Sequence, residues 1–195
     1  MKIIKNVTII VGNGQIIENG QIAFDDKIRY VGTDYKGSAD TVYDLSEYIV
    51  TPGLIDSHCH VGLFGDSLGF EGADANEDSD PVTPQLRAID GINPQDRAFR
   101  DALSAGVTTV VTGPGSANPI GGQFAAIKTY GTVVDEMIIK SPCAMKMALG
   151  ENPKTVYNEK SQAPMTRMGT LALIRETLSK ARNYRDEWDE YYKDT

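Results

Sequence analysis

The pattern of the sequence changes at Thr51-Pro52-Gly53, and this change constrains the fold more than any other feature. The fifty residues before it are rich in short runs of β-branched residues and show no helical periodicity. We expect single strands over 3–11, 27–32 and 41–50. Within 15–24 we expect a hairpin that turns at Asn19-Gly20, because a two-residue turn needs positive φ at both positions and these two residues tolerate it. Residues 1–51 are therefore predicted to form a β domain.

Beyond Gly53 the sequence predicts alternating strands and helices. A helix is expected within 93–106, where Asn93 is the predicted N-cap, Pro94 the first helical residue and Gly106 the stop. Strands are expected at 54–60 and 107–113, both buried, then a loop at 114–123, and one or two strands within 136–151. This order is typical of a parallel α/β sheet or barrel covering residues 52–195.

The last predicted element is a long helix over 168–195, in which apolar residues recur at helical spacing. We expect its aromatic residues Trp188, Tyr191 and Tyr192 to pack against the body of the protein.

The composition excludes some classes of partner. Lys and Arg number 19 against 27 Asp and Glu, and the net charge of -8 disfavours nucleic acid and anionic membranes. The two cysteines, Cys59 and Cys143, are too few for a disulfide scaffold and are expected to be reduced thiols. Neither a secretory signal nor a membrane span is visible. We therefore expect a cytoplasmic protein that acts on a small molecule.

The chain's two histidines stand together in "LIDSHCH", residues 54–60. Side chains two residues apart on a strand point to the same face, so His58 and His60 should project together. Asp56 lies on that face as well, and we expect it to bond neighbouring backbone. Two imidazoles at the carboxyl end of a barrel strand, before a long polar loop, suit a divalent metal such as Zn, Mn or Fe.

The string "VTPGLIDSHCHVGLFG" resembles the amidohydrolase superfamily. "RAIDGINPQDRAFRDALSAGVTTVVTGPGSANPIGGQ" and "MKMALGENPK" are similar to its imidazolonepropionase-like and dipeptidase-like branch, and the resemblance covers most of residues 48–155. It implies a (β/α)8 barrel of the TIM type, here about its first three strands, preceded by strands of a small β-sandwich. It also implies hydrolysis of an amide or cyclic amide C–N bond by a hydroxide activated by one or two divalent metals, most simply Zn.

The resemblance assigns roles to particular residues. His58 and His60 match the metal-binding pair. Glu151 follows a predicted strand and is the candidate carboxylate ligand, with a carbamylated Lys146 as the alternative. The Gly-rich segment after the second barrel strand offers candidates for substrate binding, which are Asn118, Gly121, Gly122 and Gln123.

Two other enzyme classes are excluded by missing motifs. Since there is no phosphate-binding GxxxxGK[ST] motif and no GxSxG motif, we reject an NTPase and a serine hydrolase.

The sequence departs from the family pattern after His60. It has no further histidine, and the late aspartate that serves as acid and base in the family has no counterpart, so the catalytic residue is unknown. We therefore expect an N-terminal part of a longer enzyme, inactive alone, that forms a homo-oligomer or associates with the missing half. A non-catalytic remnant or subunit is the alternative, and a sugar N-deacetylase of the same superfamily is a further one.

Overall fold

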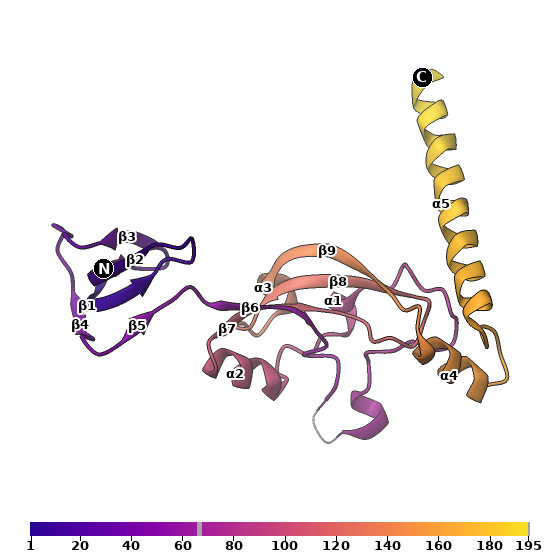
Figure 1. Ribbon diagram of the computed structural model, residues 1–195, viewed down its shortest axis with the longest axis horizontal. Coiled ribbons are helices and arrows are strands. Elements are labelled where there is room, and N and C mark those ends of the chain that lie inside the picture. The colour runs from indigo at the N-terminus through magenta and orange to yellow at the C-terminus, as the bar shows by residue number, and fades with distance from the viewer. Residues whose placement is uncertain (66–67, 195) are drawn as a thin grey trace. The chain divides into compact units, whose positions relative to one another are not determined.

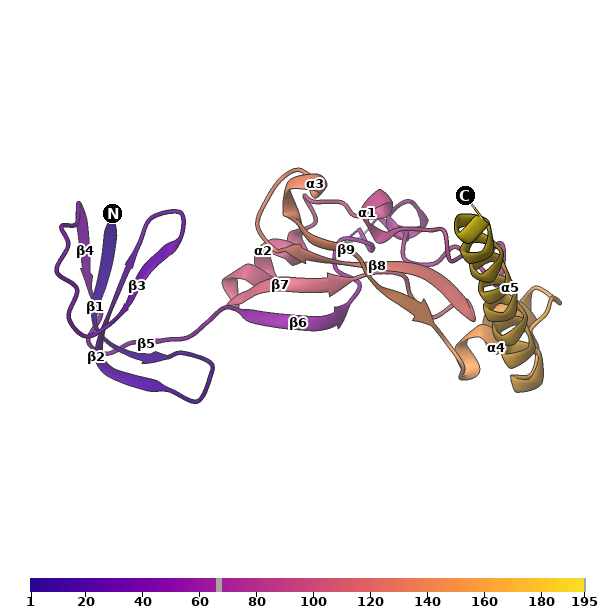
Figure 2. The same cartoon turned by 90° about the horizontal axis from the view of Figure 1, so that it is seen from above.

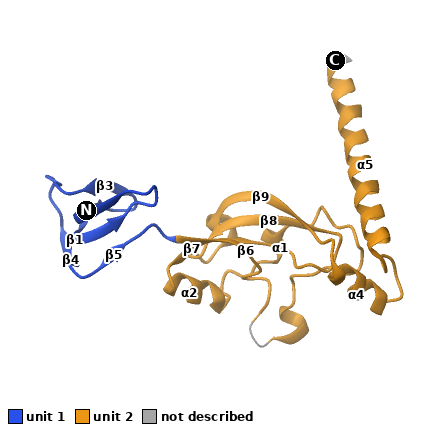
Figure 3. Cartoon of the chain, in the orientation of Figure 1, with its two compact units in different colours: residues 1–53 blue, residues 54–195 orange. Residues whose placement is uncertain are grey.

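The computed structural model describes residues 1–65 and 68–194. The chain forms two compact units, Met1–Gly53 and Leu54–Thr195, shown in different colours in Figure 3. The division falls next to the Thr51-Pro52-Gly53 triplet at which the sequence pattern changes.

The first unit is a single five-stranded sheet in the order β3-β2-β1-β4, with β5 also paired to β1. The strands are β1 (Lys2–Ile10), β2 (Ile16–Phe24), β3 (Ile28–Gly32), β4 (Thr41–Asp44) and β5 (Ile49–Val50). The first three are antiparallel, whereas β4 and β5 run parallel to β1, so residues 41–50 supply two strands rather than one. Val7, Ile9 and Ile22 form the buried core.

The predicted hairpin turn at Asn19-Gly20 is wrong. β2 continues through both residues, and the chain reverses earlier, where Val11 N–H donates to the carbonyl of Gln15 at 3.0 Å. Asn19 nevertheless has a positive φ of 50°, and the register of β1 and β2 shifts where Val7 faces Gly20. The dipeptide therefore forms an irregularity within a strand, because its tolerance of positive φ suits a bulge as well as a turn.

The second unit is built on a four-stranded sheet in the order β6-β7-β8-β9, seen in Figures 1 and 2. Its strands are β6 (Leu54–Cys59), β7 (Val107–Thr112), β8 (Ile120–Lys128) and β9 (Ile138–Met147). Its helices are η1 (Gly69–Gly72), α1 (Ala88–Gly91), α2 (Arg97–Ser104), α3 (Val134–Met137), α4 (Glu151–Glu159) and α5 (Arg167–Asp194).

The strand directions in this sheet are mixed. β6 and β7 are parallel and are connected through α2, as predicted, but β8 is antiparallel to both of its neighbours. The expectation of a loop over 114–123 is therefore wrong from Ile120 onward, where β8 begins. Since β9 reverses again, β6, β7 and β9 run the same way, and their carboxyl ends meet at one edge of the sheet.

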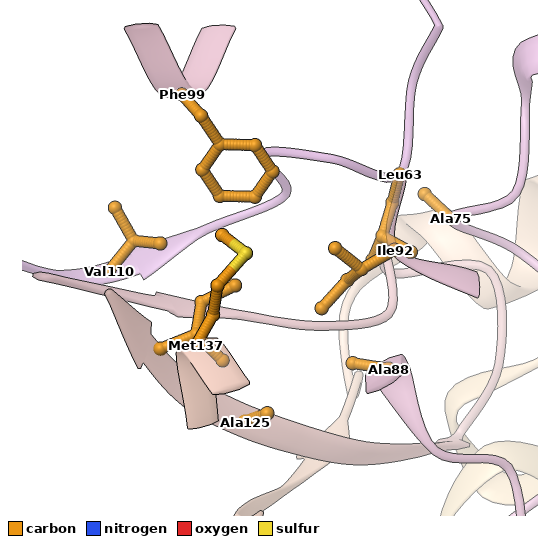
Figure 4. Packing of buried hydrophobic residues seen from close by; sticks show 9 residues of the cluster. Leu63, Ala75, Ala88, Ile92, Phe99, Val110, Ala125 and Met137 are labelled. Atoms are coloured by element: carbon orange, nitrogen blue, oxygen red, sulfur yellow. The ribbon is translucent and has the colours of Figure 1, made fainter. Parts of the chain in front are cut away.

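One hydrophobic core lies on the face of the sheet that α2 covers, shown in Figure 4. Phe99 of α2 and Met137 of α3 pack onto this core, which includes Val110 of β7 and Ile127 of β8. Leu63 comes from the segment that follows β6 and is 2% exposed. The start of the polar loop that follows β6 is thus anchored in this core.

The helix predicted within 93–106 is present but starts later than expected. Its N-cap is Asp96, not Asn93, because the Asp96 carboxylate accepts from the N–H of Ala98 at 2.9 Å. Its other oxygen accepts from the N–H of Gly62 at 3.2 Å, a bond to the segment after β6. The Asn93 side chain accepts from the nearby N–H of Gln95 instead of capping the helix. Gly106, with a φ of 85°, follows the helix as predicted.

Two predictions of burial are wrong. β6 is an edge strand, and its residues Leu54 and Ile55 are 58% and 67% exposed. The long α5 helix is present, but Trp188 and Tyr192 are exposed and stack on each other, with ring centroids 5.5 Å apart, instead of packing against the rest of the unit. Over residues 1–65 and 68–194, the structure contains no helix both long and apolar enough to cross a membrane.

Candidate metal centre

The two histidines lie side by side where β6 ends. Their ring centroids are 5.4 Å apart and the rings meet edge to face at 78°. His58 is exposed, whereas His60, the residue after the strand, is partly buried. The strand spacing thus predicts the pairing of these side chains correctly.

A hydrogen bond fixes the orientation of His60. Its Nδ1 lies 2.7 Å from the carbonyl oxygen of Gly113, the residue that follows β7. A carbonyl can only accept, so Nδ1 carries a proton and Nε2 is the ring nitrogen that this bond leaves free. Metal-binding histidines are commonly held in this way, with one ring nitrogen bonded to the protein and the other presented to the metal.

The segment around the pair is held by two more bonds. The Thr112 hydroxyl, fully buried, donates to the carbonyl of Val61 at 2.8 Å, which ties the residue after His60 to the end of β7. The Asp56 carboxylate accepts from the N–H of His58 at 3.1 Å. This confirms the expectation that Asp56 bonds neighbouring backbone.

The ring of Phe124, in β8, packs against both imidazoles. Its ring centroid lies 5.6 Å from that of His58 and 6.4 Å from that of His60, and the residue is only 4% exposed. A Cβ placed on Gly113 would collide with the same ring, so glycine at that position allows the close packing. The rigid ring therefore limits how far either imidazole can turn on this side.

The side chain of Lys146, in β9, approaches the same Phe124 ring. Its Nζ lies 6.0 Å from the centroid of Phe124, and burial lowers the pKa of its amine. The register pairs Lys146 with Gly122 and Ala144 with Phe124, which puts Lys146 and Phe124 on one face of the sheet. Lys146 and the two histidines thus approach the same aromatic ring.

Glu151 is placed differently from the prediction. β9 ends at Met147, and Glu151 is the exposed first residue of α4, beside a depression lined by Lys154 and Asn158. Over residues 1–65 and 68–194, no group of three His, Cys, Asp or Glu side chains could hold a metal. The structure therefore does not bring Glu151 together with His58 and His60.

Asn118, a predicted substrate-binding residue, is 2% exposed, and its amide is fully used within the protein. Its Nδ2 donates to the carbonyl of Glu77 at 2.6 Å and to the Thr83 hydroxyl at 2.9 Å. Its Oδ1 accepts from the Tyr157 hydroxyl at 2.6 Å. Asn118 is therefore a structural bridge between α4 and the segment before α1, and a role for it in substrate binding stays a prediction.

The other three predicted substrate-binding residues hold the segment around Leu86 against β8. The Gln123 N–H donates to the carbonyl of Leu86 at 2.8 Å, and its side chain donates to that of Pro84 at 3.0 Å. Gly122 has a φ of 124°, and a Cβ there would lie 2.7 Å from the Leu86 oxygen. Gly121 is buried, with Lys146 Cγ 3.3 Å from a Cβ built on it. These packing contacts were not expected of a loop, and a role for Gln123 and the two glycines in substrate binding stays a prediction.

Two residues of the site were not found from the sequence. Gly113 was placed at the end of a predicted strand, which is the position from which its carbonyl reaches His60. Phe124 directly follows the segment that was predicted to be a loop, and only the pairing of β8 with β7 and β9 places it beside the histidines. Two neighbouring imidazoles, one with a fixed tautomer, fit two positions of a divalent metal site. Among the described residues, no further His, Cys, Asp or Glu side chain completes such a site.

Comparison with known proteins gives partial matches to longer chains. The chain is 36% identical to the amidohydrolase tasK of Hapsidospora irregularis over 162 residues, which is 75% of this chain and 16% of that protein. It is 40% identical over 62 residues to a 5-methylthioadenosine/S-adenosylhomocysteine deaminase of Pyrococcus furiosus, covering 31% of this chain and 15% of the enzyme. No protein-family model matches the sequence.

A solved structure matches the whole described architecture. The crystal structure of an amidohydrolase from Thermotoga maritima superimposes with a TM-score of 0.91 and 41% sequence identity, covering 97% of this chain. The chain spans 49% of the length of that protein. Both the sequence and the fold therefore correspond to part of longer chains.

Proposed function

The chain belongs to the amidohydrolase superfamily, as an N-terminal portion of it, and on this premise we propose that it supplies the two-histidine part of a divalent metal site in a hydrolase of C–N bonds. The observation that carries the proposal is the bond from His60 Nδ1 to the Gly113 carbonyl, because it leaves Nε2 free beside His58. A divalent metal such as Zn²⁺ held there supplies a Lewis acid that polarises a carbonyl and lowers the pKa of water.

The protein's own part in this chemistry is to hold the imidazoles in place. Gly113 fixes the tautomer and direction of His60, and Phe124 supports both rings from below. Of the two candidates for a further ligand, Lys146 is favoured over Glu151, since its amine approaches the Phe124 ring that supports both imidazoles. The resemblance allows either a glutamate or a carbamylated lysine at this position, and a carbamate on Lys146 would turn the amine into a ligand of carboxylate type.

We further propose that β6, α2 and β7 form the first unit of a (β/α)8 barrel. Their parallel strands, and the residues gathered at the carboxyl ends of these strands, support this. In such a barrel a third parallel strand would lie beside β7. Here β8 takes that place and runs antiparallel to β7, so β8 would be an addition to the parallel strands of the barrel. The small-molecule substrate would then approach the edge at which β6, β7 and β9 end.

This chain alone is proposed to be inactive. The histidines are the chain's only two, and no third His, Cys, Asp or Glu side chain joins them in a metal-binding group among the described residues. The rest of the site would come from the complementary half of the fold, in the same protein or in a partner chain. The reduced cysteines fit a cytoplasmic location.

The proposal is tested by metal content. The purified 195-residue chain and the His58→Ala/His60→Ala variant are equilibrated with Zn²⁺ or Co²⁺, and metal per chain is measured by elemental mass spectrometry. We expect about one equivalent, weakly held, that the double variant loses. Glu151→Gln is the matched control and should bind as the unaltered chain does.

Two outcomes would contradict the proposal. Equal metal content in the unaltered chain and the double variant would exclude the histidines as ligands. That result would favour the second candidate function, a non-catalytic subunit, which the lack of a third ligand among the described residues already supports. Turnover of an amide substrate by the pure chain, lost in His58→Ala, would show instead that the chain is active alone.

A further inference from the structure

The C-terminal half of α5 carries an exposed apolar stripe. Leu178, Tyr184, Trp188 and Tyr192 follow one another at spacings of six, four and four residues along the helix, and their exposures are 55%, 63%, 42% and 70%. Tyr184 and Trp188 meet edge to face with centroids 6.1 Å apart, beside an open hollow of about 330 Å³. Figure 1 shows this half of α5 extending away from α4. Exposed aromatic stripes of this kind mark contact surfaces.

Charge is separated along the same half of the helix. Residues 178–185 contain three basic side chains, Lys180, Arg182 and Arg185, and no acidic one, which gives a charge of +3. Residues 186–193 contain four acidic side chains and one lysine, which gives a charge of -3. The midpoint between the two segments falls between Arg185 and Asp186. A partner helix that complements these charges must therefore place acidic side chains beside residues 178–185 and basic side chains beside residues 186–193.

A second copy of the same helix, running antiparallel, presents that order. We propose that residues 178–193 of α5 pair with the same residues of a second copy about a two-fold axis near Arg185 and Asp186. Arg182 then lies level with Asp189 of the second copy, and the apolar stripes face each other across the axis. Such an interface is isologous, so one patch serves both subunits and the assembly closes as a dimer.

Competing interactions within α5 are weak. Lys180 bonds Glu176 and Arg185 bonds Asp186, each at 2.6 Å, and all four side chains are more than half exposed. Exposed pairs of this kind contribute little to stability, so these side chains can turn to a partner at small cost. Antiparallel packing also sets the two helix dipoles in opposition, which is favourable. This inference is independent of the proposed metal site.

The test is the molar mass of the 195-residue chain in solution, measured by sedimentation and by light scattering over a range of concentration and salt. We expect a dimer that dissociates on dilution and weakens with added salt. An acidic variant, Lys180→Glu/Arg182→Glu, and a basic variant, Asp189→Lys/Glu190→Lys, should each weaken self-association at least about tenfold. Mixed in equal amounts, the two should restore the dimer, because each then complements the other.

The direction of the pairing is tested by cross-linking. In a background of Cys59→Ser and Cys143→Ser, Leu178→Cys and Tyr192→Cys chains are mixed and treated with a short bifunctional maleimide. Antiparallel pairing predicts cross-linked dimers in the mixture and few in either chain alone. Circular dichroism of each variant checks that α5 remains helical.

Three results would overturn the proposal. The first is a monomer at every concentration, and the second is a dimer unaffected by both charge variants, which would point to the exposed edge of β6. The third is failure of the mixed variants to associate while both remain helical.

Discussion

The Nδ1 atom of His60 lies 2.7 Å from the carbonyl oxygen of Gly113, and this contact joins the ends of two parallel strands. It fixes the direction of the imidazole in the folded chain, so the ring would already be held in place for a metal bound at Nε2. The energetic benefit is preorganisation, because the cost of ordering the side chain is met on folding.

Replacing Gly113 by alanine should weaken metal binding without removing a ligand. The new Cβ would collide with the ring of Phe124, and either the ring or the strand end must shift. Groups that hold a metal-binding histidine typically contribute about 10- to 100-fold to affinity. We expect a loss of this size in Co²⁺ titrations of Gly113→Ala. Gly150→Ala, where a Cβ meets nothing within 4 Å, is the control and should bind normally.

Lys146 and Glu151 should differ in their response to bicarbonate. If a carbamate forms on Lys146, added bicarbonate raises the metal content of the unaltered chain, because the amine and CO₂ combine to give an anionic oxygen ligand. Lys146→Met should abolish this gain, while Glu151→Gln should retain it. Loss of metal in Glu151→Gln with Lys146→Met unaffected would reverse the assignment of the ligand.

Tyr157→Phe should destabilise the second unit. The change leaves the buried Oδ1 of Asn118 without its donor, at a cost of about 1–3 kcal/mol in the free energy of unfolding. Urea denaturation measures the loss. Tyr130→Phe, at a residue that is 79% exposed, should have no measurable effect.

The same hydroxyl predicts a pH dependence. Burial, with the nearby carboxylates of Asp78, Asp80 and Glu77, raises the pKa of Tyr157 from 10.0 to about 12. A raised folded-state pKa gives stability that is present below pH 10 and is lost as the pH rises toward 12. We expect the unaltered chain to lose stability more steeply over this range than Tyr157→Phe does. Parallel curves for the two proteins would contradict the assignment.

Gly122→Ala should be more damaging than Gly106→Ala. Both residues have positive φ, 124° and 85°, so each alanine carries backbone strain of about 1–2 kcal/mol. Only at Gly122 does the new Cβ also meet a backbone oxygen, that of Leu86, at 2.7 Å. Unfolding free energies of the two variants should differ by about 1 kcal/mol or more. Equal losses would mean that the segment around Leu86 yields freely.

Local patterns in the sequence were sufficient for several elements. β1, β3, β7 and α5 follow from composition and periodicity, and the face shared by His58 and His60 follows from strand geometry alone. These features depend on neighbours within a few residues, which is the range that sequence patterns report.

The errors arose where distant segments decide between local alternatives. Asn93 and Asp96 are both good N-caps, and the bond from Gly62 to Asp96 is a long-range contact that favours the second. The Gly121-Gly122 pair is typical of a loop, but here it lets the backbone around Leu86 approach a strand. Phe124 joins the site only through strand pairing. None of these contacts leaves a local signal.

The bridge from Tyr157 through Asn118 to Thr83 has a consequence for how the protein is made. These residues lie in three segments separated by 35 and 39 positions along the chain. A nascent chain that has not yet exposed α4 lacks the hydroxyl that completes the bridge. The polar stretch before α1 should therefore stay open to proteases during synthesis and become protected only after α4 leaves the ribosome.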